Sequence, residues 1–185
     1  MAWKKGECMS DHITVLVTGG AGYIGSHMVL ALLDAGHKPV ILDDFSTGHE
    51  KLLPNGVPVF RGSVADTALV AEICKSYDFD AVAHFAASIV VPESVADPLK
   101  YYLNNTASTT GFIAACVEAG IKRFVFSSTA AVYGNQDHNP ITENASTQPE
   151  NPYGTSKLMS ETILRDCARA TDISYVISVS YTHLT

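Results

Sequence analysis

Two side chains late in the chain, Tyr153 and Lys157, have the types and spacing of a proton-transfer pair. They lie four residues apart in a segment of helical periodicity, so they share one face of the expected helix. A lysine ammonium beside a phenol lowers the pKa of tyrosine, which makes Tyr153 a candidate general base near neutral pH. Thr129, after Ser127 and Ser128, could bond a substrate hydroxyl and relay its proton. A solvated lysine beside a half-buried tyrosine gives the same spacing, so the pattern gains weight only from its context.

A glycine-rich turn near the N-terminus predicts that a dinucleotide binds there. The apolar run at 13–17 leads into VTGGAGYIG, in which Gly19, Gly22 and Gly25 are spaced three apart. Glycines at these places allow a tight turn, a close approach of the pyrophosphate and packing of a helix on a strand. The helix start adds free N–H groups and a positive dipole end. A glycine-rich turn without a ligand is the alternative.

An acidic residue follows at the spacing expected for recognition of a ribose. Asp43 lies 18 residues beyond Gly25, at the end of the apolar run 39–42. A carboxylate at this position accepts hydrogen bonds from the adenosine ribose and repels a 2′-phosphate. Residues 39–50 contain no Lys or Arg, so the sequence favours NAD over NADP. A polar strand end at Asp43 and Asp44 is the alternative.

Alternating apolar runs and helical patterns predict an α/β fold, a Rossmann-type doubly wound parallel sheet with helices on both faces. Strands are expected at 13–17, 39–42, 57–60, 81–85, 123–127 and 174–177, and helices at 23–33, 66–76, 98–119 and 153–169. The polar stretch 134–151 is expected to be a loop over the carboxyl edge of the sheet, where ligands bind in this architecture.

Composition excludes several classes of function. The chain has 185 residues, 46% of them hydrophobic, enough for one domain with a core. A net charge of −7 without a basic cluster argues against nucleic acid as a partner, and no apolar stretch is long enough for a membrane span. The seven histidines show no metal-binding spacing, and His84 is expected to be structural. The four scattered cysteines are typical of reduced thiols in a cytoplasmic protein.

Four motifs in order, VTGGAGYIGSH, HFAA, FSSTAAVYG and NPYGTSK, resemble the extended short-chain dehydrogenase/reductase family. The resemblance covers about residues 13–177, and PESVADPLKYYLNN at 92–105 narrows it to the branch that epimerises UDP-sugars. It implies a tightly held NAD, a UDP-sugar substrate, and interconversion of UDP-glucose and UDP-galactose through a 4-keto sugar. It also implies a homodimer that packs two helices per subunit, here 98–119 and 153–169.

The resemblance also implies roles for individual residues. The pyrophosphate would be cradled by Gly19, Gly22, Tyr23, Ile24 and Gly25, and the adenosine ribose held by Asp43 with Asp44 beside it. Val64 would lie against the adenine, Phe85, Ala86 and Ala87 would line the cofactor channel, Asn104 would reach that channel, and Ser127 would sit beside the nicotinamide half. Tyr153 would be the base, Lys157 would bind the nicotinamide ribose and tune Tyr153, and Thr129 would assist at the sugar 4-hydroxyl.

The sequence departs from the family in two places. Gly62-Ser63 stands where the family usually has an acid that holds the adenine amino group, so that contact is weakened. The resemblance also stops at Ile177, where the family continues into a substrate domain. We therefore expect a disordered leader over 1–12, an NAD-binding domain over 13–177 and a non-family tail over 178–185. With the substrate domain missing, the chain as written is expected to have no measurable epimerase activity.

Two other functions were weighed. Sugar-nucleotide 4,6-dehydratases carry an Asp-Glu pair directly after the catalytic threonine, and Ala130 and Ala131 occupy those places here, which argues against elimination chemistry. A catalytically silent NAD-binding fragment is the second alternative.

Overall fold

A computed structural model describes residues 12–179. Most of the expected leader (residues 1–11) and most of the expected tail (residues 180–185) lie outside the described residues. The six strands are β1 Thr14–Thr18, β2 Lys38–Asp43, β3 Val59–Arg61, β4 Ala81–His84, β5 Arg123–Ser128 and β6 Ser174–Val179. The longer helices are α1 Tyr23–Asp34, α2 Thr67–Ser76, α5 Ser108–Glu118 and α6 Pro152–Ala170. The shorter ones are α3 Val91–Ala96, α4 Pro98–Tyr101, the π-helix η2 Tyr102–Ala107, and the 3₁₀ turns η1 Glu50–Leu52 and η3 Ala130–Val132.

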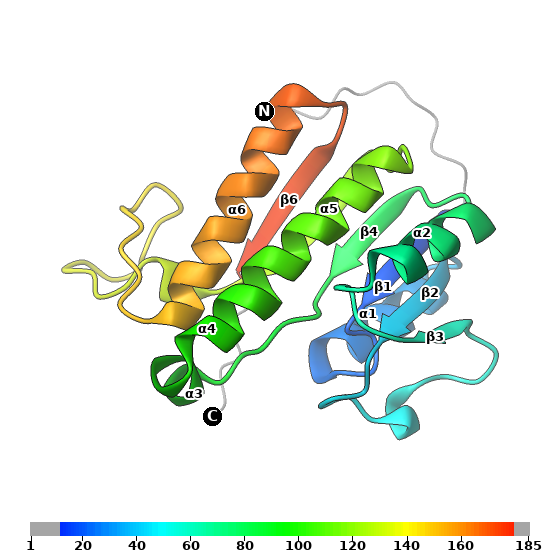
Figure 1. Ribbon diagram of the computed structural model, residues 1–185, viewed down its shortest axis with the longest axis horizontal. Helices are drawn as coiled ribbons and strands as arrows, with labels where there is room; N and C mark the ends of the chain where they lie inside the picture. The colour runs from blue at the N-terminus through cyan, green and yellow to red at the C-terminus, as the bar shows by residue number, and fades with distance from the viewer. Residues whose placement is uncertain (1–11, 180–185) are drawn as a thin grey trace.

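All neighbouring strands pair in parallel, in the order β3-β2-β1-β4-β5-β6 (Figure 1). The chain starts in the middle at β1, builds outward through β2 and β3, and then returns to the other side of β1 with β4. The strand order therefore reverses between β1 and β4, and a crevice for ligands is expected at their carboxyl ends. This arrangement confirms the predicted fold class.

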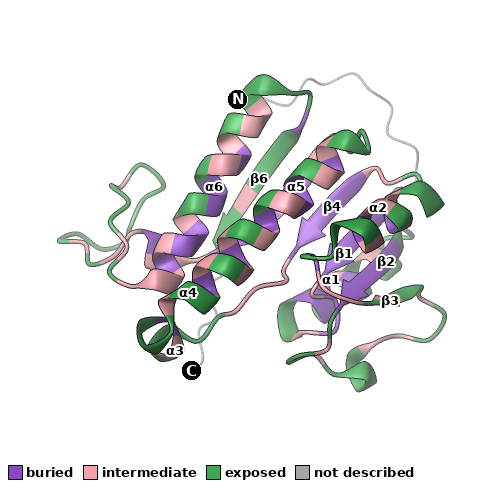
Figure 2. Cartoon of the chain, in the orientation of Figure 1, coloured by how far each residue is buried: buried purple, intermediate pink, exposed green. Residues whose placement is uncertain are grey.

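Two apolar layers cover the sheet. One face packs against α2, α5 and α6 through a cluster that includes Leu16, Val82, Phe112, Phe124 and Leu164. The other face packs against α1 through Val29, with Val15, Val17 and Ile41 from the strands. Figure 2 shows the inner strands as buried and β6 as mostly exposed, and Tyr175, Val176 and Val179 on β6 expose 37%, 43% and 37%. Between residues 12 and 179, no helix combines the length and apolar character needed to cross a bilayer.

The structure departs from the expected elements mainly in short segments. The helix expected over 98–119 begins and ends as predicted, but its middle winds as the π-helix Tyr102–Ala107. Wide turns of this kind often occur at functional sites. The prediction contained no helix at Val91–Ala96, which is only six residues long. The third strand begins two residues later than expected, at Val59, and β6 continues past Ile177 to Val179. Residues 134–151 contain no helix or strand, as predicted.

His84, at the end of β4, is fully buried and serves the core. Its ring nitrogens share hydrogen bonds with Thr18 Oγ1 (2.7 Å) and Thr109 Oγ1 (3.1 Å), and its ring stacks on Phe112 and Phe126. Burial, with the charge of Lys157 adding to it, lowers the pKa of His84 from 6.5 to about 3. The structural role expected for His84 is therefore confirmed.

We expect this histidine to make folding sensitive to acid. Because the pKa is lower in the folded chain, the unfolded chain binds the extra proton below pH 6.5, and stability falls as the pH falls from 6.5 toward 3. Between pH 7 and pH 5 the loss is about 2 kcal/mol by linkage. Urea titrations at both pH values measure it. His84→Gln should be less stable at pH 7, but its free energy of unfolding should change less between pH 7 and pH 5 than that of the parent. If the change is as large as in the parent, groups other than His84 cause the sensitivity to acid.

Candidate active site

The glycine turn lies at the reversal point and has no room for side chains. Gly19 has φ +69°, and a Cβ there would lie 2.7 Å from Ala86 N and 2.9 Å from Phe85 C. A Cβ on Gly25 would lie 2.1 Å from Gly19 O, so only glycine lets α1 start this close to β1. A Cβ on Gly22 would meet only Gly19 O, at 3.3 Å. A side chain at Gly22 would therefore press on the backbone of the same turn.

No side chain caps the start of α1. Its N-cap is Gly22, with no side-chain hydrogen bond, and its first turn contains no acidic residue. The first N–H groups of a helix have no partner within the helix, and they carry the positive end of the dipole. Tyr23 and Ile24 expose 69% and 38% of their surface here. Backbone N–H groups at such a helix start could hold a phosphate group, and we call this turn the cradle.

Asp43 ends β2 beside this cradle and is 7% exposed. Its Oδ2 accepts a hydrogen bond from Ala21 N and its Oδ1 accepts one from Phe45 N, both at 2.8 Å. The carboxylate thus joins the glycine turn to the end of β2, and each oxygen retains a lone pair for a ligand. Asp44 is exposed and accepts a bond from Ser46 N.

Sequence reasoning missed a cation next to this acid. Arg61 pairs with Asp43 in the β2–β3 register, and its guanidinium lies 4.0 Å from the centre of the Phe45 ring. Glu50 forms an ion pair with this arginine at the exposed rim. The prediction from the sequence rested on residues 39–50, which contain no Lys or Arg. It therefore overlooked Arg61, which lies on the neighbouring strand β3.

The end of β4 lies beside the end of β1, on the other side of the strand reversal. Phe85 N donates to Thr18 O at 3.0 Å, which sets Phe85, Ala86 and Ala87 beside the glycine turn. All three are partly exposed. Val64, in contrast, is 6% exposed and belongs to the core cluster, so at most its edge is open to a ligand.

The π-helix contributes two adjacent asparagines. Asn104 Nδ2 donates to Ser88 Oγ at 2.9 Å, directly after the HFAA segment. Asn105, 1% exposed, bonds both backbone groups of Ser88 through its side chain and donates to Ser156 Oγ at 3.1 Å. The prediction named Asn104 but not Asn105. The doubled asparagine in the LNN segment was the only signal, and it does not reveal which of the two side chains turns inward.

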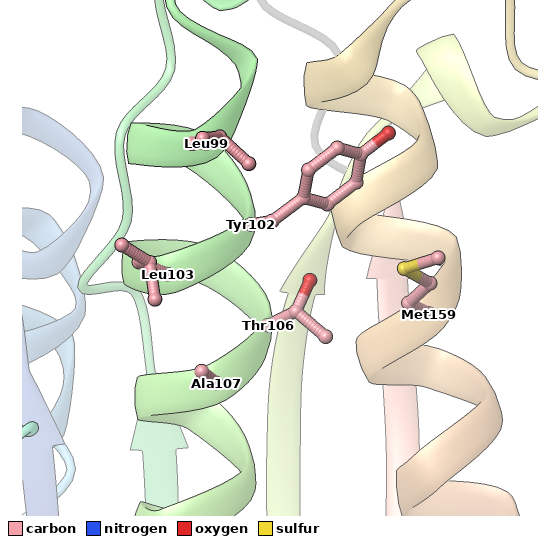
Figure 3. Close-up of a pocket in the computed structure, with 6 residues that line it drawn as sticks. All are labelled: Leu99, Tyr102, Leu103, Thr106, Ala107 and Met159. Atoms are coloured by element: carbon pink, nitrogen blue, oxygen red, sulfur yellow. The ribbon is translucent and has the colours of Figure 1, made fainter.

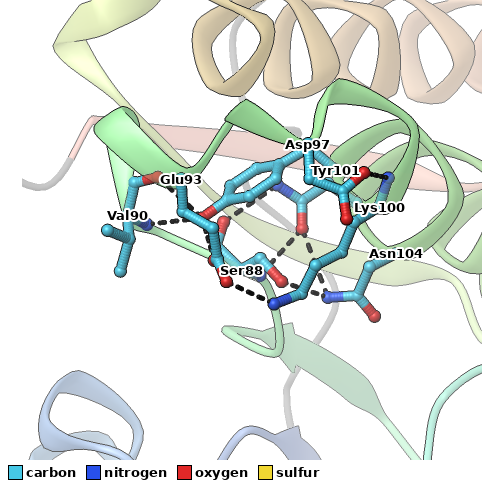
Figure 4. A network of polar contacts seen from close by, with 8 residues as sticks. Ser88, Val90, Glu93, Asp97, Lys100, Tyr101 and Asn104 are labelled. Carbon is cyan, nitrogen blue, oxygen red and sulfur yellow. Dashed lines mark hydrogen bonds and ion pairs between the residues drawn. The ribbon is translucent and has the colours of Figure 1, made fainter. Parts of the chain in front are cut away.

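A second network supports the same segment (Figure 4). The Tyr101 hydroxyl lies 2.8 Å from Glu93 Oε2 and accepts a bond from Val90 N, and Lys100 Nζ donates to Glu93 Oε1. Asp97 caps α4 by accepting from Lys100 N. These contacts hold α3 against α4.

The structure brings the proposed catalytic residues to the carboxyl end of β5. Asn151 caps α6 by accepting a hydrogen bond from Gly154 N, which sets the start of the helix and therefore the position of Tyr153. Lys157 is 3% exposed, donates from Nζ to Ser127 O at 3.0 Å and lies 4.9 Å from the Phe126 ring. Burial lowers the pKa of Lys157 to about 8.

The sequence predicted that Lys157 lowers the pKa of Tyr153, and this prediction is wrong for this structure. Burial raises the pKa of Tyr153, and only a hydrogen bond with Thr129 opposes the rise. The Lys157 ammonium bonds to Ser127 O instead. Burial therefore sets the direction of the shift in the pKa of Tyr153, and the lysine does not lower it here. Thr129 also accepts a bond from Ala131 N at 3.2 Å.

Comparison with known proteins decides the family. The profile of the "NAD dependent epimerase/dehydratase family" matches residues 15–184. This chain belongs to that family. A UDP-glucose 4-epimerase of Azospirillum brasilense is 53% identical over 163 residues, which are 88% of this chain and 47% of that protein. The chain thus spans about half the length of the curated relatives it matches.

Solved members of the NAD dependent epimerase/dehydratase family have the same architecture. A UDP-glucose 4-epimerase from Brucella ovis, in complex with NAD, superposes with a TM-score of 0.87 at 42% identity and covers 89% of this chain and 50% of its own. One from Bifidobacterium longum, in complex with NAD+ and UDP, gives a TM-score of 0.84 at 39% identity and covers 89% and 52%. Among residues 12–179, no group of three or more His, Cys, Asp or Glu side chains is arranged to hold a metal ion.

Proposed function

We propose that this chain supplies the NAD-binding domain of an enzyme that epimerises UDP-sugars at C4, with UDP-glucose and UDP-galactose as substrates. The observation that carries this proposal is the cradle at Gly19–Gly25, where a Cβ on Gly19 or Gly25 would clash with backbone atoms and no side chain caps the start of α1. The similarity to UDP-glucose 4-epimerases supports the substrate. We also propose that residues 13–177 form the binding domain.

In this proposal the crevice holds the cofactor along the carboxyl ends of the strands. The first turn of α1 binds the pyrophosphate, Asp43 the adenosine ribose and Lys157 the nicotinamide ribose. Bound NAD would supply the hydride acceptor at C4 and return the hydride to the other face of the sugar. The free thiols of Cys74, Cys116 and Cys167 are consistent with a cytoplasmic enzyme.

Tyr153 accepts the proton of the sugar 4-hydroxyl, and Thr129 bonds that hydroxyl. Because burial raises the pKa of Tyr153, the phenol is neutral at pH 7 until added positive charge lowers its pKa. In this structure the Lys157 ammonium bonds to Ser127 O, so we propose that Lys157, one helical turn away, lowers the pKa of Tyr153 only when substrate and cofactor occupy the site. Ala130 and Ala131 begin η3 without an ionisable side chain, so elimination of water is not supported.

A chimera tests this function. The segment of the Azospirillum brasilense enzyme that matches this chain would be replaced by the corresponding residues of this chain, which are 53% identical. We expect the chimera to convert UDP-galactose into UDP-glucose in a coupled assay. A folded chimera that binds NAD but does not turn over would contradict the catalytic part of the proposal and leave a silent NAD-binding module.

We further propose that the protein is a homodimer. An open apolar groove of about 380 Å³ runs between η2 and α6, lined by Leu99, Tyr102, Leu103, Thr106, Ala107 and Met159 (Figure 3). Leu99 and Leu103 expose 70% and 65% of their surface on one helical face. A second copy would cover this face through the helices expected from the family resemblance.

A charge in the groove should separate the copies. We expect Leu103→Glu to give a monomer by light scattering at micromolar concentration, where the parent is a dimer, because a carboxylate cannot be buried unpaired in an apolar interface. Leu30→Glu is the matched control, since Leu30 is also exposed, at 45%, but lies on α1. A monomeric parent would overturn the dimer.

A further inference from the structure

Glu161 is a buried carboxylate that the proposed chemistry does not use. It lies on α6 and is 3% exposed. Its Oε1 accepts a short hydrogen bond from Ser128 Oγ, and its Oε2 pairs with Arg165 Nη2 at 2.6 Å. Arg165 is itself partly exposed. A buried acid needs such partners because burial without them is costly.

Two residues one turn apart on α6 hold two consecutive residues of β5. Lys157 Nζ donates to Ser127 O, and Glu161 accepts from the hydroxyl of Ser128. Thr129 directly follows these two serines in the chain. The contacts therefore fix α6, and with it Tyr153, relative to the strand end that carries the threonine.

Glu161 is also the charged group that favours the ammonium form of Lys157. Burial lowers the pKa of Lys157, and the charge of Glu161 opposes that change. His84, the last residue of β4, interacts electrostatically with Lys157. The other charged or titratable groups on α6 and on the elements packed against it are Glu93 on α3, Lys100 and Tyr101 on α4, Tyr102 on η2, Cys116 and Glu118 on α5, Arg123 on β5, Tyr175 on β6, and Tyr153, Arg165, Asp166, Cys167 and Arg169 on α6. His84 is neutral near pH 7, because burial lowers its pKa to about 3. Lys100 and Tyr101 both donate hydrogen bonds to Glu93.

We propose that Glu161 is a positioning residue for the Tyr153–Lys157 pair: its carboxylate keeps the buried lysine charged and holds α6 in register with β5. The catalytic meaning of this role rests on the proposed function. The electrostatic role does not, because it concerns this chain without any ligand.

Lysine-selective ¹³C NMR of the parent chain tests the role directly. The Cε signal of Lys157, assigned by its loss in Lys157→Gln, is followed from pH 6 to pH 11. In Glu161→Gln the amide still bonds Ser128 but carries no charge, and we expect the pKa of Lys157 to fall by on the order of one unit. An unchanged value would overturn the proposal.

Arg165→Gln is the matched control. It also removes the Glu161–Arg165 ion pair but leaves the carboxylate, so the pKa of Lys157 should stay at or above the parent value; a fall equal to that in Glu161→Gln would assign the effect to the lost ion pair and overturn the proposal. The double variant Glu161→Gln/Arg165→Gln leaves no charge at either position, so it gives a second measurement if Glu161→Gln alone folds poorly. We expect its pKa for Lys157 to be as low as that in Glu161→Gln. A double variant with the parent value would contradict us.

NAD titrations at pH 6 and pH 9 connect this role to the proposed function. We expect Glu161→Gln to lose affinity between these pH values more steeply than the parent, because its lysine loses its charge at lower pH. A parent that binds no NAD would contradict the proposed function, while the NMR result would still decide the role of Glu161.

Discussion

Tyr153→Phe in the epimerase chimera will reduce turnover of UDP-galactose by about 10²- to 10⁴-fold, the usual effect of losing a general base. The phenyl ring can still pack edge-on against Tyr101, whose ring centre is 6.3 Å away, so the fold is kept. Only the hydroxyl that bonds Thr129 is lost. The coupled assay measures the rate, and calorimetry checks that NAD still binds.

Tyr175→Phe is the matched control for that change. Tyr175 lies on β6, away from the start of α6, and is 37% exposed. Its variant should keep the parent rate. If the Tyr153 variant also epimerises at the parent rate, then Tyr153 is not the base and the assignment of the whole pair is wrong.

Gly25→Ala will disrupt the cradle itself. The added Cβ would lie 2.1 Å from Gly19 O and 2.8 Å from Gly19 C, which are backbone atoms and cannot turn aside. The turn must shift, at a cost of about 1–3 kcal/mol in stability. We expect the affinity for NAD to fall on the order of 10- to 100-fold, equivalent to about 1.4–2.8 kcal/mol.

Gly111→Ala separates this clash from a general effect of losing a glycine. Gly111 lies within α5, and its Cβ would meet only Thr67 Cγ2, at an ordinary 3.5 Å. Alanine should therefore be neutral or stabilising there, by up to about 1 kcal/mol, and NAD binding should not change. Equal losses of affinity in both variants would refute the cradle.

The sequence predicted the elements that local patterns define. Each of the six strands contains apolar residues of a predicted run, and α1, α2 and α6 begin and end within a few residues of their predicted limits. The glycine spacing predicted the turn, because a Cβ on Gly22 or Gly25 would lie within 3.3 Å of Gly19 O in the same turn; the need for Gly19 comes instead from Phe85 and Ala86 on a distant segment. The sequence did not predict short elements such as α3, because six residues give too little periodicity.

What the sequence could not predict depends on contacts between distant segments. Arg61 lies opposite the acid at the end of β2 only because β3 pairs in that register. Asn105 joins Ser88 to Ser156, which lie 17 and 51 residues away. The raised pKa of Tyr153 follows from its burial, which no spacing of residues reveals.

We propose that this chain binds NAD at the glycine turn and at Asp43. Calorimetric titration of the chain with NAD and NADP tests it most directly. We predict saturable binding of NAD at one site, weaker binding of NADP, and a smaller difference between the two in Asp43→Asn, because the variant removes the charge that repels a 2′-phosphate. A folded chain that binds no NAD, or that binds NADP equally well or better, would contradict this account.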